Sequence, residues 1–479
     1  MEHGISAVLL DFNSTLQALP GIEGDRLLQR LLSGGLRVTL VSPRENTAQE
    51  LVTRTPGVDL AGAGVGLAEA ARQVLQVHAL PPSALALVAG VALCSRLSAL
   101  SEHTGCRAFF FDPAAQQGHA GWQALPRLPD LLHRIAWSWH STDKDCLVVG
   151  FTMKWSRERQ LAARGFFPLV PRDGLVFLPL DWQQPLEVQG PFHVVLHKAT
   201  DELRSLLPNQ TPRFSANMDL LCTFLRAHPE VCLVDRFEDV IKVCDRIKMA
   251  TLLRGIRDLE PIEGIAVRIP NQCEAQSFAD PAALVDELSR HGIAAPCIVK
   301  PAVACGLPEA HQMAVVCDAA GFADLQVPLP ACIQQYINHG EVVHKVYVLG
   351  DQVFVVPRAS TADIAPPPTG PSPAASSTAI CFHSLQPLPA DLQGTNSHDS
   401  TGGVRSIHMP TIHAAVDWLN PRLGLHLYGF DVAIETTTGT HYILDVNFFP
   451  SCQEVQDAAG AFHRALKLAR VRHGQQAWP

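Results

Sequence analysis

The sequence predicts an α/β protein with several domains, and three observations lead to this fold class. The chain has 479 residues, more than one ordinary hydrophobic core accommodates, so it is expected to divide into domains. Segment 1–140 alternates apolar strand-like runs with helical stretches, which is typical of a parallel sheet. The last third of the chain contains β-branched runs joined by turn residues, which predicts antiparallel hairpins.

The bulk composition is that of a soluble globular protein. Hydrophobic residues make up 47% of the chain and charged residues 17%, and no apolar run approaches the roughly 18 residues of a membrane-spanning helix. The net charge of −9 argues against a nucleic-acid-binding protein. We therefore expect no membrane span and no nucleic-acid partner, and nothing in the sequence demands more than a monomer.

Cysteine usage and the N-terminus predict an intracellular protein. The 13 cysteines are scattered, odd in number and never spaced as CxxC, which is typical of reduced thiols and not of a disulfide framework or a zinc site. The opening MEHGIS lacks the basic region and apolar segment of a secretory signal. A cytoplasmic location, extending to the nucleus, is expected.

Segment 1–140 is expected to form a small parallel sheet of its own. Buried strands are predicted in 7–16, 35–43, 84–93 and 106–114. Ligands of open α/β sheets bind at the carboxyl ends of the strands. The polar residues at those ends are Asp11, Asn13, Thr15, Ser42 and Asp112.

The motif at the end of the first strand resembles the first motif of haloacid dehalogenase-like phosphohydrolases, DxDx[TV]. Here it reads Asp11-Phe12-Asn13-Ser14-Thr15, so Asn13 replaces the usual general acid. The first lysine of the chain is Lys144, so the lysine that neutralises phosphate in that family is missing. Each group typically contributes orders of magnitude in rate. We predict a degenerate, non-catalytic domain.

Segment 144–238 begins with a strand at 146–153 and a basic helix over Met153–Ala163. Strand-like runs follow at 167–173, 174–181 and 191–197. The last run carries His197 and Lys198 to its end, and Thr200 and Asp201 resemble the start of a helix. The pattern therefore puts a cation at a strand–helix junction, where anions bind readily.

Segment 239–332 carries the next candidate cation. Residues 234–256 have a helical period, with Ile241, Val243, Cys244, Ile247 and Ala250 among the inward positions and Arg246 and Lys248 pointing elsewhere. A buried strand then ends at Lys300, ahead of a loop that contains Gly306. Such a lysine is well placed to hold a nucleotide phosphate, although a lysine that extends to solvent from a strand end is equally common.

The hairpin of 331–358 predicts a second pair of cations. Pairing about Gly350-Asp351 sets Lys345 opposite Val356 and Val343 opposite Arg358, so Lys345 and Arg358 share a face. Two cations on one face favour an anion between them, or else a solvated face. Segment 361–403 is rich in proline and serine and is expected to be largely disordered, with 381–388 ordering against a ligand. Helices are expected at Met409–Leu425 and 458–472.

The most informative stretch is the second hairpin, Leu425–Pro450. If it folds about Thr437–Gly439, Asp431 lies opposite Asp445, and Asn447 shares the face of Asp445. Like charges so close repel, and a hard cation such as Mg²⁺ relieves the repulsion. The alternative is a pair of solvated acids at strand ends.

An ordered series of motifs runs from Cys146 to the C-terminus: GFTMKWSR, GPFHVVLHKATD, DRIKM, CIVKPAVACG, HQMAVV, CIQQYINHGEVVHKVYVLG, VVPRAS, LYGFDV and ILDVNFFP. With them the chain resembles the inositol 1,3,4-trisphosphate 5/6-kinase family, and its N-terminal extension resembles that of a plant member. The resemblance implies an ATP-grasp kinase core preceded by a small Rossmann-like, haloacid dehalogenase-like α/β domain. The implied boundaries are 1–140, 144–238 on the substrate side, 239–332 in the centre, and 333–479 with the insert 361–403.

The resemblance also implies a substrate, two cofactors and a set of site residues. ATP and Mg²⁺, as two ions, would serve transfer of the γ-phosphate to an inositol tris- or tetrakisphosphate. The implied metal ligands are Asp431, Asp445 and Asn447. The implied ATP contacts are Arg246, Lys300, Gln334, Lys345, Arg358, Ser360 and Ser384. The implied substrate contacts are Arg157, Lys198, His311, Lys345, Asn447 and Ser451, with Lys345 and His311 as the catalytic pair.

Three positions depart from the family pattern and point to altered substrate preference. Cys305 stands where the family often has His or Asp, Ser451 where it has Gly, and Arg157 where it has Lys. Arginine keeps the charge but offers a planar fork instead of a point cation. Three other functions remain open: a carboxylate–amine ligase, an inositol phosphate sensor or isomer-interconverting phosphotransferase, and a kinase joined to an active phosphatase.

Overall fold

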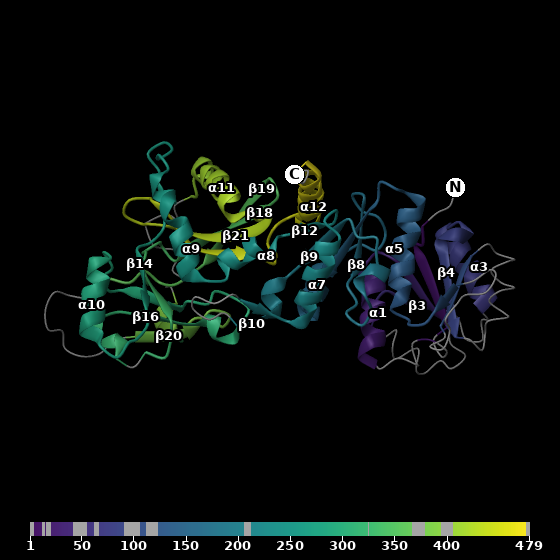
Figure 1. The fold of residues 1–479 in the computed structure, drawn as a ribbon, viewed down its shortest axis with the longest axis horizontal. Coiled ribbons are helices and arrows are strands. Elements are labelled where there is room, and N and C mark those ends of the chain that lie inside the picture. The colour runs from purple at the N-terminus through teal and green to yellow at the C-terminus, as the bar shows by residue number, and fades with distance from the viewer. Residues whose placement is uncertain are drawn as a thin grey trace. The chain divides into compact units, whose positions relative to one another are not determined.

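The computed structural model describes residues 4–11, 15, 21–41, 55–61, 67–90, 106–111, 123–205, 212–323, 325–365, 379–393 and 406–475 (Figure 1). They divide into two compact units. Unit 1 comprises residues 1–196, 224–232 and 473–479, and unit 2 comprises residues 197–223 and 233–472. Within the described residues, no helix combines the length and apolar character needed to cross a membrane.

Unit 1 opens with a six-stranded parallel sheet in the order β3-β2-β1-β4-β5-β6. Its strands are β1 (Ala7–Asp11), β2 (Arg37–Val41), β3 (Val58–Leu60), β4 (Leu85–Gly90), β5 (Arg107–Phe111) and β6 (Gln123–Leu125). This is the order of doubly wound nucleotide-binding folds, with a topological switch between β1 and β4. The predicted strands at β1, β2, β4 and β5 are confirmed, whereas the short β3 and β6 were not predicted.

Three helices flank this sheet: α1 (Gly21–Ser33), α3 (Leu67–His78) and α5 (Asp130–Thr142). α3 packs Ala70 and Val74 against Ala7 and Leu9 of β1 and Leu85 of β4. Ala7 and Leu9 are two positions apart, as residues on one face of a strand must be. Burying such side chains stabilises the unit by about 25 cal/mol per Å² of apolar surface removed from water.

The polar cluster predicted at the strand ends is described only in part. Asp11 is buried at the end of β1, and the buried Thr15 donates its Oγ1 proton to the Asp11 carbonyl. Asn13, Ser42 and Asp112 lie outside the described residues. The resemblance of this domain to haloacid dehalogenases stays a prediction.

Unit 1 also contains β7 (Leu147–Thr152) and β8 (Leu175–Pro179), which pair in parallel within a sheet of order β12-β9-β7-β8. The other two strands are β9 (Val194–His197) and β12 (Cys232–Val234), and the helices of this region are α6 (Trp155–Ala162) and α7 (Ala216–Ala227). The strand predicted at 167–173 is wrong. Pro168 and Pro171 have no N–H to give a ladder, so this run passes as a loop.

The first sheet of unit 2 is antiparallel, with the order β14-β17-β15-β16-β20. Its strands are β14 (Gln272–Ala275), β15 (Cys297–Pro301), β16 (Gln312–Val316), β17 (Ala331–Gln335) and β20 (Ala379–His383). Leu284 and Leu288 of α10 (Pro281–Arg290) pack on its core with Val299 and Ile333.

β20 lies inside the segment 361–403, whose expected disorder stays a prediction. Residues 379–383 pair in full register with β16, from Ala379 opposite Val316 to His383 opposite Gln312. A five-residue strand gains its order from a partner that is remote in sequence, which composition alone does not reveal. Residues 366–378 and 394–405 lie outside the described residues.

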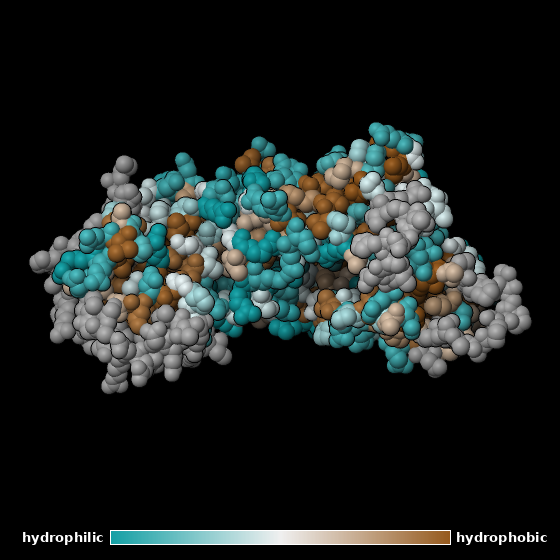
Figure 2. Space-filling model, turned by 180° about the vertical axis from the view of Figure 1, so that it is seen from behind, coloured by the Kyte–Doolittle hydropathy of each residue, from teal (hydrophilic) through white to brown (hydrophobic). Residues whose placement is uncertain are grey.

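The second sheet of unit 2 has the order β13-β22-β21-β18-β19. Its strands are β13 (Val267–Arg268), β18 (Val342–Leu349), β19 (Gln352–Ala359), β21 (Leu427–Ile434) and β22 (His441–Phe448), with helices α11 (Met409–Leu423) and α12 (Ala458–Gln475) following the prediction closely. A short antiparallel pair, β10 (Leu203–Ser205) and β11 (Arg213–Phe214), completes the unit. Figure 2 shows hydrophilic residues over much of one face of the molecule, with hydrophobic residues in scattered groups among them.

The segment 234–256 forms short turns of helix instead of one long helix. It contains α8 (Phe237–Val240), a 3₁₀ turn over Ile241–Val243, α9 (Arg246–Leu253) and a 3₁₀ turn over Arg254–Asp258. The Asp245 carboxylate breaks the run because it caps α9, accepting from the N–H groups of Ile247 and Lys248. The cap turns Arg246 inward, where it is buried.

Candidate functional site

Three neighbouring strands of unit 2 bring a lysine and two acids into line. Lys345 of β18 lies opposite Asp431 of β21, and Asp431 lies opposite Asp445 of β22. Lys345 Nζ donates to Asp431 Oδ2 over 2.9 Å. Both hairpin registers predicted from the sequence are therefore confirmed, including Lys345 opposite Val356.

The ladder is irregular beside the two acids. Asp431 pairs with Asp445, but the next residue, Val432, pairs with Ile443, so Leu444 is an extra residue on β22. Such bulges often re-aim groups next to functional sites. The Leu444 carbonyl lies 3.5 Å from both Lys300 Nζ and Gln334 Nε2.

The acids present the donor set that Mg²⁺ prefers. The side chains of Asp431 and Asp445 are 25% and 18% exposed, so both are half-buried yet reachable from solvent. Asn447 follows two positions after Asp445 on the same strand and adds an amide oxygen. Mg²⁺ usually takes one or two carboxylates and completes its shell with water and phosphate oxygens. The described residues hold no cluster of three or more His, Cys, Asp or Glu side chains, so the fit rests on this smaller oxygen set.

The central sheet supplies a second cation. Lys300, at the end of β15, is buried and donates to Gln334 Oε1 on the neighbouring β17 over 2.8 Å. Burial lowers the pKa of Lys300, and the nearby Asp445 carboxylate opposes that shift. Lys300 therefore belongs electrostatically with the acid pair, although it comes from the other sheet.

Arg246 joins the two sheets of this unit. Its Nη1 donates to the carbonyls of Pro301 and Val303 at 2.7 Å each, and its Nη2 lies 3.8 Å from Asp445 Oδ2. Its Nε is buried without a hydrogen-bond partner in the described part of the chain. An incompletely satisfied buried guanidinium is costly, and an anion near it would relieve that cost.

Lys198 and Cys305 occupy another side of this cluster. Lys198 donates to the Phe448 carbonyl and lies 4.8 Å above the centre of the Phe448 ring. The thiols of Cys305 and Cys244 are 3.8 Å apart. The hydrogen bond with Cys244 lowers the pKa of the Cys305 thiol, and the positive charges of Lys198 and Arg246 add to the effect against the cost of burial.

His197 is not the basic residue that the sequence suggested. It is fully buried, with Nε2 2.6 Å from the Asp235 carbonyl and Nδ1 accepting from the Ala199 N–H. Burial lowers the pKa of His197 to about 4, so the ring is neutral at physiological pH. The expected helix start after it is a single 3₁₀ turn over Ala199–Glu202. Lys198 alone supplies a cation at this strand end.

His311 and Ser384 are brought together from different segments. His311 Nδ1 lies 3.0 Å from Ser384 Oγ, and the two imidazoles of His311 and His383 are 5.5 Å apart. Burial lowers the pKa of His311, and the nearby His383 and Arg246 act in the same direction. His311 is therefore expected to be mainly neutral at physiological pH, able to donate or accept one hydrogen bond.

Arg358 has a partner that sequence reasoning missed. Its Nη2 contacts Glu454 Oε1 and Oε2 at 2.8 Å and Tyr347 Oη at 2.6 Å. An anion beside Lys345 and Arg358 was expected, and Asp431 and Glu454 each supply one. No spacing rule links Arg358 to Glu454, because 96 residues separate them along the chain.

The remaining predicted residues stay without a tested role. Ser360 donates its backbone N–H to the Glu341 carbonyl, and Ser451 follows β22. Arg157 lies in α6 of unit 1. The roles assigned to these three, and to the cluster as a whole, remain predictions, whereas the geometry of Lys345, Asp431, Asp445, Lys300, Gln334 and Arg246 is a finding.

Two family models match this chain. The inositol 1,3,4-trisphosphate 5/6-kinase ATP-grasp domain matches residues 263–464, and the pre-ATP-grasp domain of the same kinase matches residues 148–240. Together they cover more than half of the chain. The ATP-grasp match contains the acid and lysine cluster, by which we mean Lys300, Gln334, Lys345, Asp431 and Asp445. Lys198 falls in the pre-ATP-grasp match, and Arg246 falls in neither.

Individual relatives extend the same finding. Inositol-tetrakisphosphate 1-kinase 6 of rice, Oryza sativa, is 33% identical over 335 residues, which is 68% of this chain and 60% of the relative. Inositol-tetrakisphosphate 1-kinase of zebrafish, Danio rerio, is 28% identical over 64% of this chain and 75% of the relative. A RimK-domain ATP-grasp protein of Sphaerobacter thermophilus gives a TM-score of 0.36 at 17% identity, covering 68% of this chain and 98% of that one.

Proposed function

Because the chain belongs to the inositol 1,3,4-trisphosphate 5/6-kinase family of ATP-grasp proteins, we propose that it transfers the γ-phosphate of ATP to a hydroxyl of an inositol tris- or tetrakisphosphate. The chain spans 60% of the length of its rice relatives. Activity and substrate are accordingly proposed here from the residues themselves.

One observation carries the proposal: two carboxylates and three cations converge from two sheets. Asp431 and Asp445 face each other, Lys345 pairs with the first, and Arg246 approaches the second at 3.8 Å. Lys300 Nζ lies 3.5 Å from the carbonyl oxygen of Leu444, the residue directly before Asp445. Phosphoryl transfer needs little covalent help from the protein, because positioning and charge stabilisation supply most of the rate.

Each residue then has a role. Lys300 and Arg246 bind nucleotide phosphate, and Gln334 orients Lys300 through its 2.8 Å hydrogen bond. Lys345 compensates the charge of the phosphoryl group in transfer, held in place by Asp431. Asp431, Asp445 and Asn447 would hold Mg²⁺, which neutralises phosphate oxygens when bound.

The acceptor is expected to carry several phosphates. Lys198, His311 and Arg157 are the groups proposed to hold it, alongside Lys345, Asn447 and Ser451. His311 contributes a hydrogen bond and not a full charge, since its pKa is lowered by burial.

The proposal is tested by incubating the full chain with γ-labelled ATP, Mg²⁺ and a panel of inositol tris- and tetrakisphosphates, then separating products by charge. We expect one labelled product with one more phosphate than its parent, and no transfer when Mg²⁺ is chelated. The matched control is Glu435→Gln, at the turn of the β21–β22 hairpin, which should leave the rate of transfer unchanged.

Three outcomes would contradict the proposal, each in favour of a different function. ATP cleavage that requires a carboxylate and an amine, with no transfer to any inositol phosphate, would favour a ligase. Tight binding of one inositol phosphate with no transfer would favour a sensor. Label moving between isomers in the presence of ADP alone would show that the protein interconverts isomers.

A further inference from the structure

Unit 1 contains a cavity of about 460 Å³, and all of its lining residues belong to this unit. Its walls come from four places: one face of α1, the end of β5, the turn from β6 into α5, and the segment after β8 of the second sheet. Two of these places lie at the carboxyl ends of β5 and β6, which are neighbours in the six-stranded parallel sheet. That edge is where open α/β sheets bind ligands, and the volume lies in the usual range of small-molecule sites.

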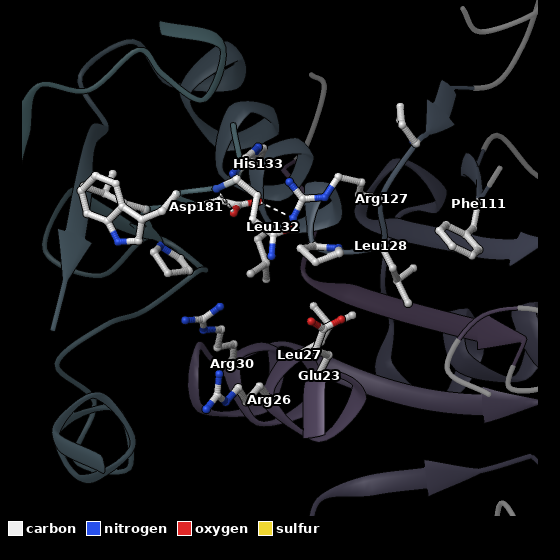
Figure 3. Close-up of a pocket in the computed structure, with 16 residues that line it drawn as sticks. Glu23, Arg26, Leu27, Arg30, Phe111, Arg127, Leu128, Leu132, His133 and Asp181 are labelled. Carbon is white, nitrogen blue, oxygen red and sulfur yellow. Dashed lines mark hydrogen bonds and ion pairs between the residues drawn. The ribbon is translucent and has the colours of Figure 1, made fainter. Parts of the chain in front are cut away.

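Cations enter the cavity from two sides. Figure 3 shows Arg26 and Arg30 extending from α1 on one side, with Arg127 and His133 on the other. Two acids, Glu23 and Asp181, also line it. Two of the three guanidinium groups are neutralised by acids, Arg30 by Glu158 and Arg127 by Asp181, so an anion would be bound by Arg26 together with the remaining donors of Arg30.

The two inner arginines are held rigidly. Arg30 forms a two-pronged ion pair with Glu158, at 2.6 Å and 2.9 Å. Arg127 Nη2 pairs with Asp181 Oδ2 at 2.6 Å. A guanidinium has five N–H donors, so Arg30 keeps the donors of Nη1 for another acceptor.

The charge of Arg26 is not neutralised by any acid among the described residues. Arg26 is exposed and forms no ion pair with any described residue, while its guanidinium lies 5.3 Å from the centre of the Trp155 ring. Arg30 lies 5.6 Å from the same ring. Contact with one indole limits the motion of both groups, and their free donors can then serve one phosphate.

The rest of the lining is apolar and aromatic apart from Gln183. It includes Leu27, Phe111, Leu128, Leu132, Leu180 and Trp182. An inorganic anion would leave this surface without a partner. A ligand with a flat ring and one phosphate would fill both parts of the cavity.

We propose that this cavity binds an organic phosphomonoester of mononucleotide size, with Arg26 and Arg30 on its phosphate and the apolar wall on its ring. The site is separate from the proposed kinase site, and its existence does not depend on the kinase reaction. Asp11 is not among its lining residues, so it is also distinct from the strand end that resembles haloacid dehalogenases.

The test uses the full chain carrying Lys300→Met, which weakens nucleotide binding at the unit 2 cluster. Calorimetric titration with AMP is compared with adenosine and with inorganic phosphate. We expect saturable binding of AMP at one site, and at least about tenfold weaker binding of the other two, because each lacks one half of the contacts. Adding Arg26→Gln should weaken AMP binding by about tenfold.

Arg72→Gln is the matched control, since Arg72 is an exposed arginine of unit 1 outside the cavity. It should leave AMP affinity unchanged, and Arg26→Gln should leave the melting temperature unchanged because its side chain is exposed. Absence of saturable AMP binding, or equal loss in both variants, would overturn the proposal. Adenosine or inorganic phosphate binding as tightly as AMP would overturn it as well.

Discussion

Lys300 holds a positive charge where water hardly reaches. Burial lowers its pKa from the ordinary value, and Asp445 only partly offsets the effect. Because the folded state then binds this proton less tightly than the unfolded state, Lys300 destabilises the fold below its lowered pKa, and that penalty fades as the pH rises through it. The lysine is therefore a functional charge kept at a cost to stability.

Lys300→Met is expected to raise the free energy of unfolding at pH 7 by about 1 kcal/mol. The same change should weaken binding of ADP with Mg²⁺ by about tenfold or more, because a charge-assisted contact to phosphate is lost. Denaturant unfolding at pH 7 together with nucleotide titration measures both quantities. A variant that is less stable and binds ADP as well as the wild type would contradict this role.

Two half-buried cysteines of unit 2 are predicted to react differently. The Cys244 hydrogen bond and the nearby cations lower the pKa of Cys305, whereas burial and Asp318 raise the pKa of Cys317. Since the thiolate is the reactive form, iodoacetamide should label Cys305 roughly tenfold faster at pH 7.5. Peptide mass spectrometry over time measures the ratio, and faster labelling of Cys317 would show the assignment to be wrong.

At the residue scale, the sequence shows which residues can carry a charge, but not whether their surroundings keep them charged. Lys300, Asp431 and Asp445 stand out because a charge inside an apolar run is costly without compensation. His197 looks equally basic in the sequence, yet a backbone carbonyl and burial make it neutral. That difference depends on Asp235, which is distant in sequence and joins it only in the folded chain.

At the scale of elements, hairpins were predictable and remote pairings were not. A short turn fixes register, so Lys345 against Val356 and Asp431 against Asp445 follow from counting residues. The bulge at Leu444 does not, although its carbonyl connects to Lys300. Pairing of β20 with β16 also escapes prediction, because the partner strand lies far away along the chain.

The loop after β15 depends on one glycine. Gly306 has a φ of +84°, and a Cβ there would lie 2.4 Å from the Thr200 carbonyl oxygen. Gly264 has a similar φ of +81° but nothing within 4 Å. Comparing Gly306 with Gly264 separates the cost of backbone strain from the cost of steric crowding. Both glycines have a positive φ, but only Gly306 packs against the turn that follows Lys198.

Gly306→Ala is expected to lower the free energy of unfolding by about 3 kcal/mol, and Gly264→Ala by about 1 kcal/mol. Denaturant unfolding of the two variants measures the difference. Equal losses of unfolding free energy in the two variants would show that the loop after β15 moves to accommodate the added Cβ and that Thr200 does not fix its position.

At the scale of the whole molecule, the sequence predicted the parallel sheet of 1–140 and the antiparallel hairpins of the last third, but not the complete strand order. Alternating strands and helices indicate a parallel sheet in 1–140, yet β3 and β6 are only three residues long and carry too weak a pattern to be recognised. The strand order β3-β2-β1-β4-β5-β6 is seen only in the folded structure, because the local sequence pattern does not say which strands are neighbours. The domain boundaries at 140, 238 and 332 stay predictions.

The N-terminal domain is expected to release no phosphate from phosphomonoesters. Asn13 replaces the usual acid, and no lysine precedes Lys144. Wild type and Asp11→Ala should therefore give the same rate of phosphate release from a generic phosphomonoester, as measured by colorimetric assay. A clear loss in Asp11→Ala would show that this domain is an active phosphatase.

The proposed kinase reaction depends on the paired acids of the β21–β22 hairpin. Single-turnover transfer from γ-labelled ATP to a mixture of inositol tris- and tetrakisphosphates measures that dependence. Asp445→Asn keeps the shape but removes the charge, and should slow transfer by at least about a hundredfold. Glu435→Gln, at the turn of the same hairpin, should leave the rate within about twofold of wild type. Equal rates in wild type and Asp445→Asn would contradict the proposal that the paired acids serve phosphoryl transfer.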